Sequence, residues 1–401
     1  MKRFVLFMMF VLAASVSAQK FDGLALTPPM GWNTWNEFAC DVDERLIMDA
    51  ADVIVSSGMR DAGYKYVVID DCWQGERDSL GFIRPDPKRF PSGIKALADY
   101  IHSKGLKFGI YSDAGWKTCG GKPGSRGYEF QDAMKFAEWG VDYLKYDWCN
   151  TEGLSAEGAY LTIRNALYAA GRPIVLSICE WGNNEPWKWA KDIGHLWRIS
   201  GDIGPIFDGE EGHGSWASWG VLQILEMRGD IRKYSGPDHW NDFDMMEVGN
   251  GMSFEEDRAH FSLWCMMGSP LMAGNDLRKM SEQTRSILTN KEAIAVDQDS
   301  LGVQGFKCYH KNDWEIWAKP LQHGELALCF LNRSEGPVTA VYDWHHIQWI
   351  KDDANGFHYD FIRDVYTLRD IWAGKDAGTT AKPFKAVLKP HDVVLLRLKK
   401  K

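Results

Sequence analysis

Short apolar segments alternate with segments of helical periodicity over the first three quarters of the chain. The apolar segments have the length of buried strands and fall at residues 30–35, 66–71, 107–113, 143–147, 174–179, 196–200, 243–248 and 270–274. Between them, apolar residues recur every three or four positions, over residues 43–62, 94–104, 128–139 and 156–170. Strands that alternate with helices predict a parallel sheet, and eight such units predict an α/β fold of the (β/α)8 TIM-barrel type.

The pattern changes near residue 303. Short apolar runs separated by turn residues follow, at residues 306–310, 314–320, 326–331, 338–343 and 393–398. This pattern is typical of an antiparallel β-sandwich. We therefore expect a barrel over residues 19–302 and a C-terminal antiparallel β-sandwich over residues 303–401. Within the barrel, the long loop at residues 204–238 is expected to be functional, because long loops in compact domains usually are.

Residues 1–18 have the features of a secretory signal peptide, with a basic start, an apolar run and small residues before Gln19. The run is too short to span a bilayer, and no later stretch is apolar enough for a membrane helix. No cysteine follows the run, which argues against a lipid anchor. We expect an exported protein, periplasmic or secreted, without a membrane span.

The charge balance argues against nucleic acid as a partner. The chain carries 46 Lys and Arg against 55 Asp and Glu, and losing Lys2 and Arg3 with the signal peptide changes the net charge from −9 to −11. Such a surface repels nucleic acid and anionic membranes. Among the eight cysteines there is no Cys-x-x-Cys pair, and the chain has no His-Glu-x-x-His motif. We therefore expect neither a metal site nor a cofactor.

The segment at residues 143–147 carries the first sign of chemistry. Strand alternation places Tyr143, Lys145 and Asp147 on one face. At the C-terminal end of a barrel strand such side chains face the active site, where a nearby ammonium favours an ionised carboxylate, as a nucleophile requires. The alternative is a solvated ion pair on an edge strand.

Other strand ends are acidic too, and they decide between these two interpretations. The acidic residues at strand ends are Asp70, Asp71, Asp113, Asp147, Glu180, Asp202, Asp242 and Asp244. A single acidic strand end indicates little, because Asp is also a common helix N-cap, and we assign two or three of these residues to capping and loop hydrogen bonds. Eight together favour an active site.

Six motifs stand at these strand ends. They are Met-Gly-Trp-Asn-Thr-Trp (30–35), Ile-Asp-Asp-Cys-Trp (69–73), Gly-Ile-Tyr-Ser-Asp (109–113), Lys-Tyr-Asp-Trp-Cys (145–149), Cys-Glu-Trp (179–181) and Asn-Asp-Phe-Asp-Met (241–245). Together and in this order they resemble glycoside hydrolase family 27, the melibiase-type α-galactosidases. The resemblance covers about residues 24–302, and the C-terminal module matches in type only. It implies a retaining exo-glycosidase that removes terminal α-linked D-galactose from oligosaccharides or galactosylated glycans.

The resemblance implies that Asp147 is the nucleophile and Asp202 the general acid/base. A retaining glycosidase needs two carboxyl groups about 5–5.5 Å apart, one to attack the anomeric carbon and one to protonate the leaving oxygen. Asp147 ends the fourth predicted strand and Asp202 follows the sixth, so both are expected at the barrel mouth. Lys145 is expected to keep Asp147 ionised.

The resemblance also implies a set of sugar-binding residues. Asp70 and Asp71 are expected to accept hydrogen bonds from the 4- and 6-hydroxyls, and Arg198 lies toward the 2- and 3-hydroxyls or, alternatively, is a structural partner of a loop carboxylate. The full set is Trp35, Asp70, Asp71, Tyr111, Lys145, Cys179, Glu180, Trp181, Arg198 and Asp244. Trp181 above all is expected to exclude a 2-acetamido group. The implied disulfides are Cys40–Cys72 and Cys119–Cys149, with Cys179 unpaired.

Two kinds of alternative remain. One keeps the fold and mechanism but changes the sugar, giving a β-L-arabinopyranosidase or an α-N-acetylgalactosaminidase. The paired Asp70 and Asp71 favour galactose over arabinose, because they leave room for a 6-hydroxymethyl contact. The other is a non-catalytic carbohydrate-binding protein on a decayed barrel. The presence of both Asp147 and Asp202 argues against decay.

Overall fold

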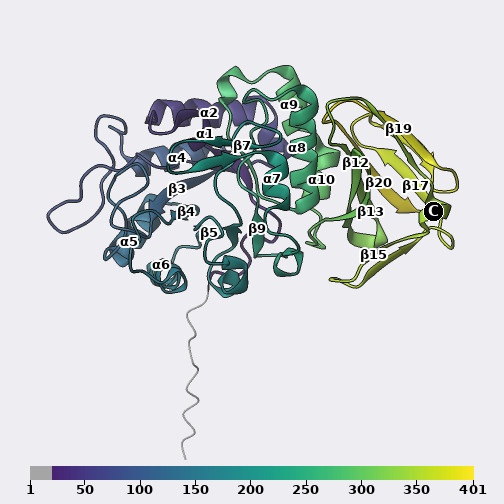
Figure 1. The fold of residues 1–401 in the computed structure, drawn as a ribbon. Coiled ribbons are helices and arrows are strands. Elements are labelled where there is room, and N and C mark those ends of the chain that lie inside the picture. Colours follow the sequence, from purple (N-terminus) through teal and green to yellow (C-terminus); the bar gives the residue numbers. More distant parts are fainter. Residues whose placement is uncertain (1–19) are drawn as a thin grey trace, which may run out of the picture.

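The computed structural model describes residues 20–401, so the predicted signal peptide at residues 1–18 lies outside the described part. The described chain has a barrel joined to an antiparallel sandwich (Figure 1). The last barrel helix ends at Asp297 and the first sandwich strand begins at Phe306, on either side of the predicted boundary at residue 303. No helix within residues 20–401 is long and apolar enough to cross a membrane.

The barrel is an eight-stranded parallel sheet, as predicted. Its strands are β1 (Met30–Asn33), β2 (Tyr66–Val68), β3 (Lys107–Asp113), β4 (Tyr143–Asp147), β5 (Val175–Cys179), β6 (Leu196–Arg198), β9 (Trp240–Asp242) and β10 (Leu271–Ala273). Their order is β10-β1-β2-β3-β4-β5-β6-β9. The ring closes through an isolated parallel bridge between Met246, after β9, and Ala273 of β10. All eight strand ends therefore meet at one mouth.

One strand prediction is wrong in position. The seventh strand is Trp240–Asp242 and not residues 243–248. Asn241 is buried within it and is satisfied by donating from Nδ2 to the Ile231 carbonyl and to Gln304 Oε1. The apolar run that follows is a loop in which only Met246 bridges to the sheet. Apolar periodicity missed the strand because its own residues include a buried amide and a buried carboxylate.

Helices surround the barrel. They are α1 (Trp35–Phe38), α2 (Glu44–Ser56), α3 (Met59–Ala62), α4 (Ile94–Ser103), α5 (Glu129–Trp139), α6 (Ala156–Ala170), α7 (Val221–Glu226), α8 (Phe254–Met267), α9 (Glu282–Leu288) and α10 (Lys291–Asp297). Short 3-10 helices are η1 (Pro186–Lys188), η2 (Ala190–Asp192), η3 (Arg232–Tyr234) and η4 (Leu277–Lys279). The helix predicted at residues 43–62 is divided into α2 and α3, because Gly58 adopts a left-handed conformation with φ 87°.

The C-terminal domain is the predicted antiparallel sandwich. Its main sheet has the order β11-β12-β13-β20-β17-β18, and β14 pairs with β19 while β15 pairs with β16. The strands are β11 (Phe306–Lys311), β12 (Trp314–Pro320), β13 (Leu326–Asn332), β14 (Val338–Tyr342), β15 (Trp349–Asp352), β16 (Phe357–Asp360), β17 (Tyr366–Asp370), β18 (Lys375–Thr379), β19 (Phe384–Leu388) and β20 (Val393–Lys400), with the short helices η5 (Gln322–Gly324) and α11 (Trp344–Ile347). The five strands β15 to β19 were not predicted.

Helix α8 joins the two domains. Most of its side chains are buried, because one side faces the barrel and another packs on β12, β13 and β20 (Figure 1). Arg258 of α8 forms a bidentate ion pair with Asp392, and Lys319 of β12 donates to the carbonyl of Cys265 at 2.8 Å. The sandwich is therefore fixed to the side of the barrel.

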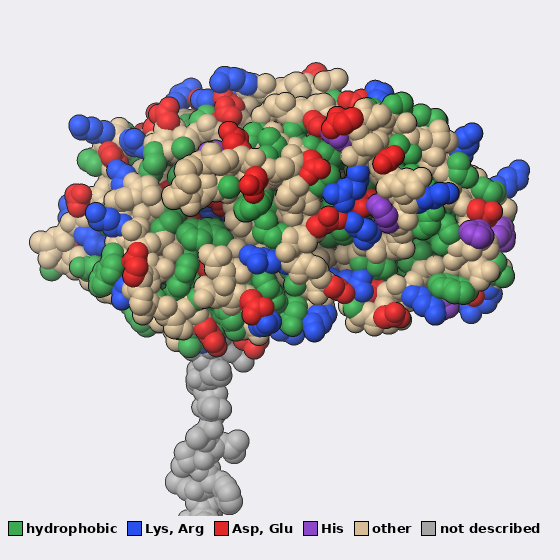
Figure 2. Space-filling model, viewed as in Figure 1, with side chains coloured by type: hydrophobic (Ala, Val, Ile, Leu, Met, Phe, Trp, Pro, Cys, Tyr) green, Lys and Arg blue, Asp and Glu red, His purple; other side chains and the backbone are tan. Residues whose placement is uncertain are grey.

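The loop at residues 204–238 is ordered into secondary structure. It contains a hairpin of β7 (Glu210–Gly212) and β8 (Ala217–Trp219), followed by α7 and η3. On the face shown in Figure 2, acidic and basic side chains are interspersed and do not form one large basic area.

Candidate active site

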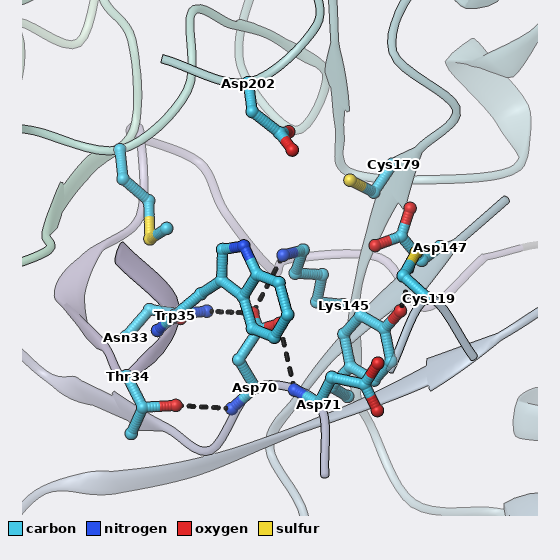
Figure 3. Close-up of polar contacts among 12 residues, drawn as sticks. Asn33, Thr34, Trp35, Asp70, Asp71, Cys119, Lys145, Asp147, Cys179 and Asp202 are labelled. Carbon is cyan, nitrogen blue, oxygen red and sulfur yellow. Dashed lines mark hydrogen bonds and ion pairs between the residues drawn. The ribbon is translucent and has the colours of Figure 1, made fainter. Parts of the chain in front are cut away.

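Two carboxylates point into the space above the barrel strands. Asp147 is the last residue of β4, and its side chain is directed toward the space from which Asp202 approaches on the loop after β6 (Figure 3). Asp147 is 5% exposed, whereas 39% of the Asp202 side chain is exposed. The charge of Asp202 acts on Asp147 and raises its pKa. The structure thus brings together the two residues proposed from sequence as the catalytic pair.

Lys145 is held by Asp70 and not by Asp147. Its ammonium is 2.8 Å from Asp70 Oδ2, and the same oxygen accepts from Asn33 Nδ2 at 2.7 Å (Figure 3). Thr34 Oγ1 in turn accepts from the Asp70 backbone N–H at 3.0 Å. The motif after β1 therefore fixes Asp70, and Asp70 fixes the lysine. Asn33 and Thr34 have this role although sequence reasoning assigned them none.

Burial of Asp147 acts against the expectation that Lys145 keeps it ionised, although the ammonium acts in the expected direction. Burial is the largest influence on Asp147 and raises its pKa, the Lys145 ammonium lowers it, and the Asp202 carboxylate raises it again. The result is a pKa of about 7. The lysine therefore offsets only part of the cost of burying this carboxylate.

Asp113 is the neighbour of Asp147 in the sheet register and was given no role from sequence. It is fully buried and accepts from the backbone N–H groups of Gly115 at 2.6 Å and Cys149 at 2.9 Å. Burial and the Asp147 charge raise the pKa of Asp113 to about 9. Asp113 thus organises the loops beside the nucleophile position and disfavours a second negative charge there.

Arg198 ties the Asp202 loop to the loop after β9. Its Nη2 lies 3.0 Å from Asp202 Oδ1 and 2.7 Å from Asp244 Oδ2, and it is 4% exposed. Asp244 Oδ2 also accepts from the Ile203 backbone N–H at 2.8 Å. In this structure Arg198 pairs with loop carboxylates. This is the structural role that the sequence left open beside a contact with the 2- and 3-hydroxyls of the sugar. Asp244 has φ 78°, an uncommon left-handed conformation that aims its carboxylate at these donors.

Asp71 is held by the loop that the second disulfide anchors. Its carboxylate accepts from the backbone N–H groups of Cys72 and Gly120, each at 2.6 Å. A Cβ at Gly120 would lie 2.9 Å from Asp71 Oδ2 and closer still to the Cys72 sulfur, so only glycine fits. Burial raises the pKa of Asp71.

Both expected disulfides are present, Cys40–Cys72 and Cys119–Cys149. The first fixes the loop after α1 to the end of β2, and the second fixes the loop after β3 to the end of β4. The two bridges lie close together, because a Cβ at Gly120, next to Cys119, would lie 2.5 Å from the Cys72 sulfur. Cys179 is unpaired and buried, as expected, and its Sγ lies 3.8 Å from Arg198 Nη1.

A small cavity of about 30 Å³ lies at the base of the site. It is lined by Asn33, Tyr143, Lys145, Ser177, Cys179, Arg198, Asp242, Asp244, Met245 and Met272. In the close-up the Trp35 indole is drawn above Asp70, next to the end of the Lys145 side chain (Figure 3). Tyr111 is buried, with the Lys145 ammonium 5.3 Å from its ring centroid. Of the predicted binding residues, Lys145, Cys179, Arg198 and Asp244 line this cavity, and Tyr111 lies beside Lys145.

Glu180 is fully buried and follows the last residue of β5. Its Oε2 accepts from the backbone N–H of Asn184 at 2.6 Å and from Asn184 Nδ2 at 2.8 Å, so it closes a local turn. Cys179, the last residue of β5, lines the small cavity. Trp181 has φ 60°, and its carbonyl accepts from Arg228 at 3.3 Å. The other carboxylate oxygen of Glu180, Oε1, is buried without a hydrogen-bond partner among residues 20–401, and the sugar contact of Glu180 stays a prediction.

Among residues 20–401, one group of side chains has the spacing of a metal site, namely Asp113, Cys119 and Cys149. The two cysteines are bonded to each other, so they offer no thiolate ligands. The donor set does not fit a metal ion.

Comparison with known proteins matches both domains. Residues 27–299 match the family model described as alpha galactosidase A, and residues 311–398 match the alpha galactosidase C-terminal beta sandwich domain. Alpha-galactosidase A from Cellvibrio japonicus is 55% identical over 97% of this chain and 96% of its own length. The crystal structure of alpha-galactosidase I from Mortierella vinacea is 39% identical with a TM-score of 0.87, covering 94% of this chain and 98% of that one.

More distant similarity extends to a relative with another named activity. A family 27 β-L-arabinopyranosidase from Geobacillus stearothermophilus is 25% identical with a TM-score of 0.78, over 94% of this chain and 97% of that one. The family match, the near full-length relatives and the fold agree with the six motifs. The chain therefore belongs to glycoside hydrolase family 27, the melibiase-type α-galactosidases.

Proposed function

We propose that the protein is an α-galactosidase that hydrolyses terminal α-linked D-galactose with retention of configuration. The observation that carries this proposal is the pair of carboxylates, Asp147 and Asp202, directed into one space above a fixed Lys145–Asp70 ion pair. The relatives named alpha-galactosidase, at up to 55% identity over nearly the whole chain, support galactose as the sugar.

The two carboxylates divide the work of a double displacement. The Asp147 carboxylate attacks the anomeric carbon while the Asp202 carboxyl group gives its proton to the departing glycosidic oxygen. Water then attacks the galactosyl ester, and Asp202 takes a proton from that water. The greater exposure of Asp202 leaves room beside it for the leaving group to depart and for the attacking water to enter. The burial of Asp147 shields the ester from unassisted hydrolysis.

Asp70 and Asp71 are placed to recognise the sugar. Both are about 1% exposed and already accept hydrogen bonds from protein donors, so their oxygen positions are fixed before substrate binds. Remaining lone pairs accept from the 4- and 6-hydroxyls, where galactose differs from glucose and from arabinose. Lys145 supplies a donor beside them.

We also propose that the protein is exported, to the periplasm or beyond the cell. The signal-peptide pattern of residues 1–18 supports this location. The disulfides Cys40–Cys72 and Cys119–Cys149 support it as well, because such bonds persist in oxidising compartments.

The wild-type protein tests the proposed function in one experiment. We expect p-nitrophenyl α-galactoside to exceed α-N-acetylgalactosaminide and β-L-arabinopyranoside by at least about a hundredfold in kcat/KM. NMR should show the α-anomer of galactose as the first product. An equal or faster rate on either of the other two sugars contradicts the proposed preference for galactose. A first-formed β-anomer contradicts retention of configuration.

A further inference from the structure

The β7–β8 hairpin carries an exposed aromatic pair outside the catalytic centre described above. Trp216, in the turn of the hairpin, is 54% exposed, and the His213 ring packs on it with centroids 4.2 Å apart. His213 Nε2 lies 2.9 Å from Ser218 Oγ, which fixes the imidazole over β8. The His213 backbone N–H donates to the Trp216 carbonyl at 2.8 Å. The indole is thus held in place with one face available.

The hairpin is hydrogen-bonded to the loop that carries the proposed general acid. The backbone N–H of Trp219 donates to the Asp202 carbonyl at 2.8 Å, and that of Gly204 donates to the Trp219 carbonyl at 2.9 Å. Ile203 and Trp219 form a parallel bridge. The loop and the hairpin therefore form one small sheet, and the hairpin cannot move far without moving Asp202.

The glycines of the loop show which face of this sheet each side chain takes. A Cβ at Gly204 would lie 2.8 Å from Ser218 Oγ, whereas a Cβ at Gly201 would lie 2.9 Å from the indole nitrogen of Trp219. Because side chains alternate along extended chain, Asp202 shares the face of Gly204 and Ser218. The imidazole that contacts Ser218, and the indole packed on it, extend from this same face.

The hairpin has no basic residue of its own. Between Arg198 and Arg228 the sequence has no Lys or Arg, while Asp208, Glu210 and Glu211 lie in or beside the hairpin. This surface repels an anionic group and accepts a neutral one.

We infer that the Trp216–His213 pair binds the leaving-group sugar of the substrate, and that the substrate is a neutral galactosyl oligosaccharide. The inference rests on the proposed function, because the departing oxygen takes its proton from Asp202 and so leaves on that side. Trp216 precedes Ser218 by two residues, roughly 6–7 Å along extended chain, and so lies about the length of one sugar ring from the residue that shares the face of Asp202. An indole presents a flat apolar face to a pyranose ring and a polar edge to its hydroxyls.

The test compares two substrates whose leaving groups need the same proton. Methyl α-galactoside releases methanol, which has no ring. An α-1,6-galactosyl glucose disaccharide releases glucose, which has one. Trp216→Ala should lower kcat/KM on the disaccharide about tenfold, the lower range for a lost apolar contact in a substrate pocket, and leave methyl α-galactoside unchanged within twofold. Trp349→Ala, at a half-exposed tryptophan on β15 of the sandwich, is the matched control and should change neither.

Each other result decides against the inference. An equal loss on both substrates means that Trp216 acts on Asp202 or on the galactose, and no loss on the disaccharide means that it does not contact the leaving group. If the wild type hydrolyses neither substrate, the proposed function itself is wrong. That outcome differs from both results above, which contradict only the binding role of the hairpin.

Discussion

Replacing Lys145 by methionine should destabilise the protein far more than removing a surface ion pair. The Lys145 side chain is 14% exposed and Asp70 is 1% exposed, with 2.8 Å between their charged atoms. Removing one partner of a buried pair leaves an uncompensated charge and costs about 3–5 kcal/mol. Lys95 and Asp99 form a pair at 2.6 Å with side chains 56% and 57% exposed, so Lys95→Met should cost only about 0.3–0.5 kcal/mol.

Urea unfolding at pH 7 measures the loss of unfolding free energy in Lys145→Met and in Lys95→Met. Each loss should appear as a lower urea midpoint, with the dependence of the free energy on urea concentration unchanged. Combining Lys145→Met with Asp70→Asn should recover part of the lost stability, because the second change removes the unpaired charge. A loss below about 1 kcal/mol for Lys145→Met, equal to that of Lys95→Met, would refute the role given to this pair.

The same substitution should move the pH dependence of activity. Lys145 lowers the pKa of Asp147, so its removal should raise that pKa above about 7. Attack needs ionised Asp147. In a plot of kcat/KM against pH, the fall on the acidic side should therefore move to higher pH. An unchanged acid limb would mean that Asp147 does not control it.

Two further predictions concern the acid and the pH dependence of stability. Asp202→Ala should slow methyl α-galactoside at least tenfold more than an activated aryl galactoside, because only the former needs a proton to depart; equal losses on both contradict the assignment. Burial raises the pKa of Asp147 to about 7 and of Asp113 to about 9. Because these values lie above those of the unfolded chain, the stability that the two protonated carboxyls contribute is complete below about pH 4 and is lost as the pH rises through 7 and 9. The melting temperature of the ligand-free protein should thus fall by at least about 4 °C from pH 5 to pH 9, and an increase over that range would contradict the burial argument.

The barrel was predictable from sequence because its strands are buried on both faces. Segments such as residues 107–113 and 143–147 contain buried apolar and aromatic residues and end in a carboxylate, and both strands lie where they were predicted. The strand Trp240–Asp242 was missed, since Asn241 is buried through partners 10 and 63 residues away that no local pattern reveals. Several strands of the sandwich were missed for a related reason, because they are short and partly exposed, as at Lys375–Thr379.

The location of the site residues was predictable from the sequence, but their ion-pair and hydrogen-bond partners were not. Strand ends located Asp147, Asp70 and Asp71, because parallel strands bring their C-terminal ends to one mouth. Sequence alone did not reveal that Lys145 pairs with Asp70, because this contact joins positions 75 residues apart. Likewise sequence alone did not reveal that Asn184 donates to the Glu180 carboxylate in the turn after β5.

The central claim is that Asp147 forms a covalent bond to galactose, and azide rescue of Asp147→Ala tests it most directly. The variant should fold as the wild type does by circular dichroism and lose at least on the order of a thousandfold in turnover. Azide should enter the space left by the carboxylate, attack the anomeric carbon of an aryl α-galactoside and displace the aryl oxide. NMR should then show β-galactosyl azide as the product; near wild-type turnover without azide, or an α-configured azide product, would mean that Asp147 is not the nucleophile.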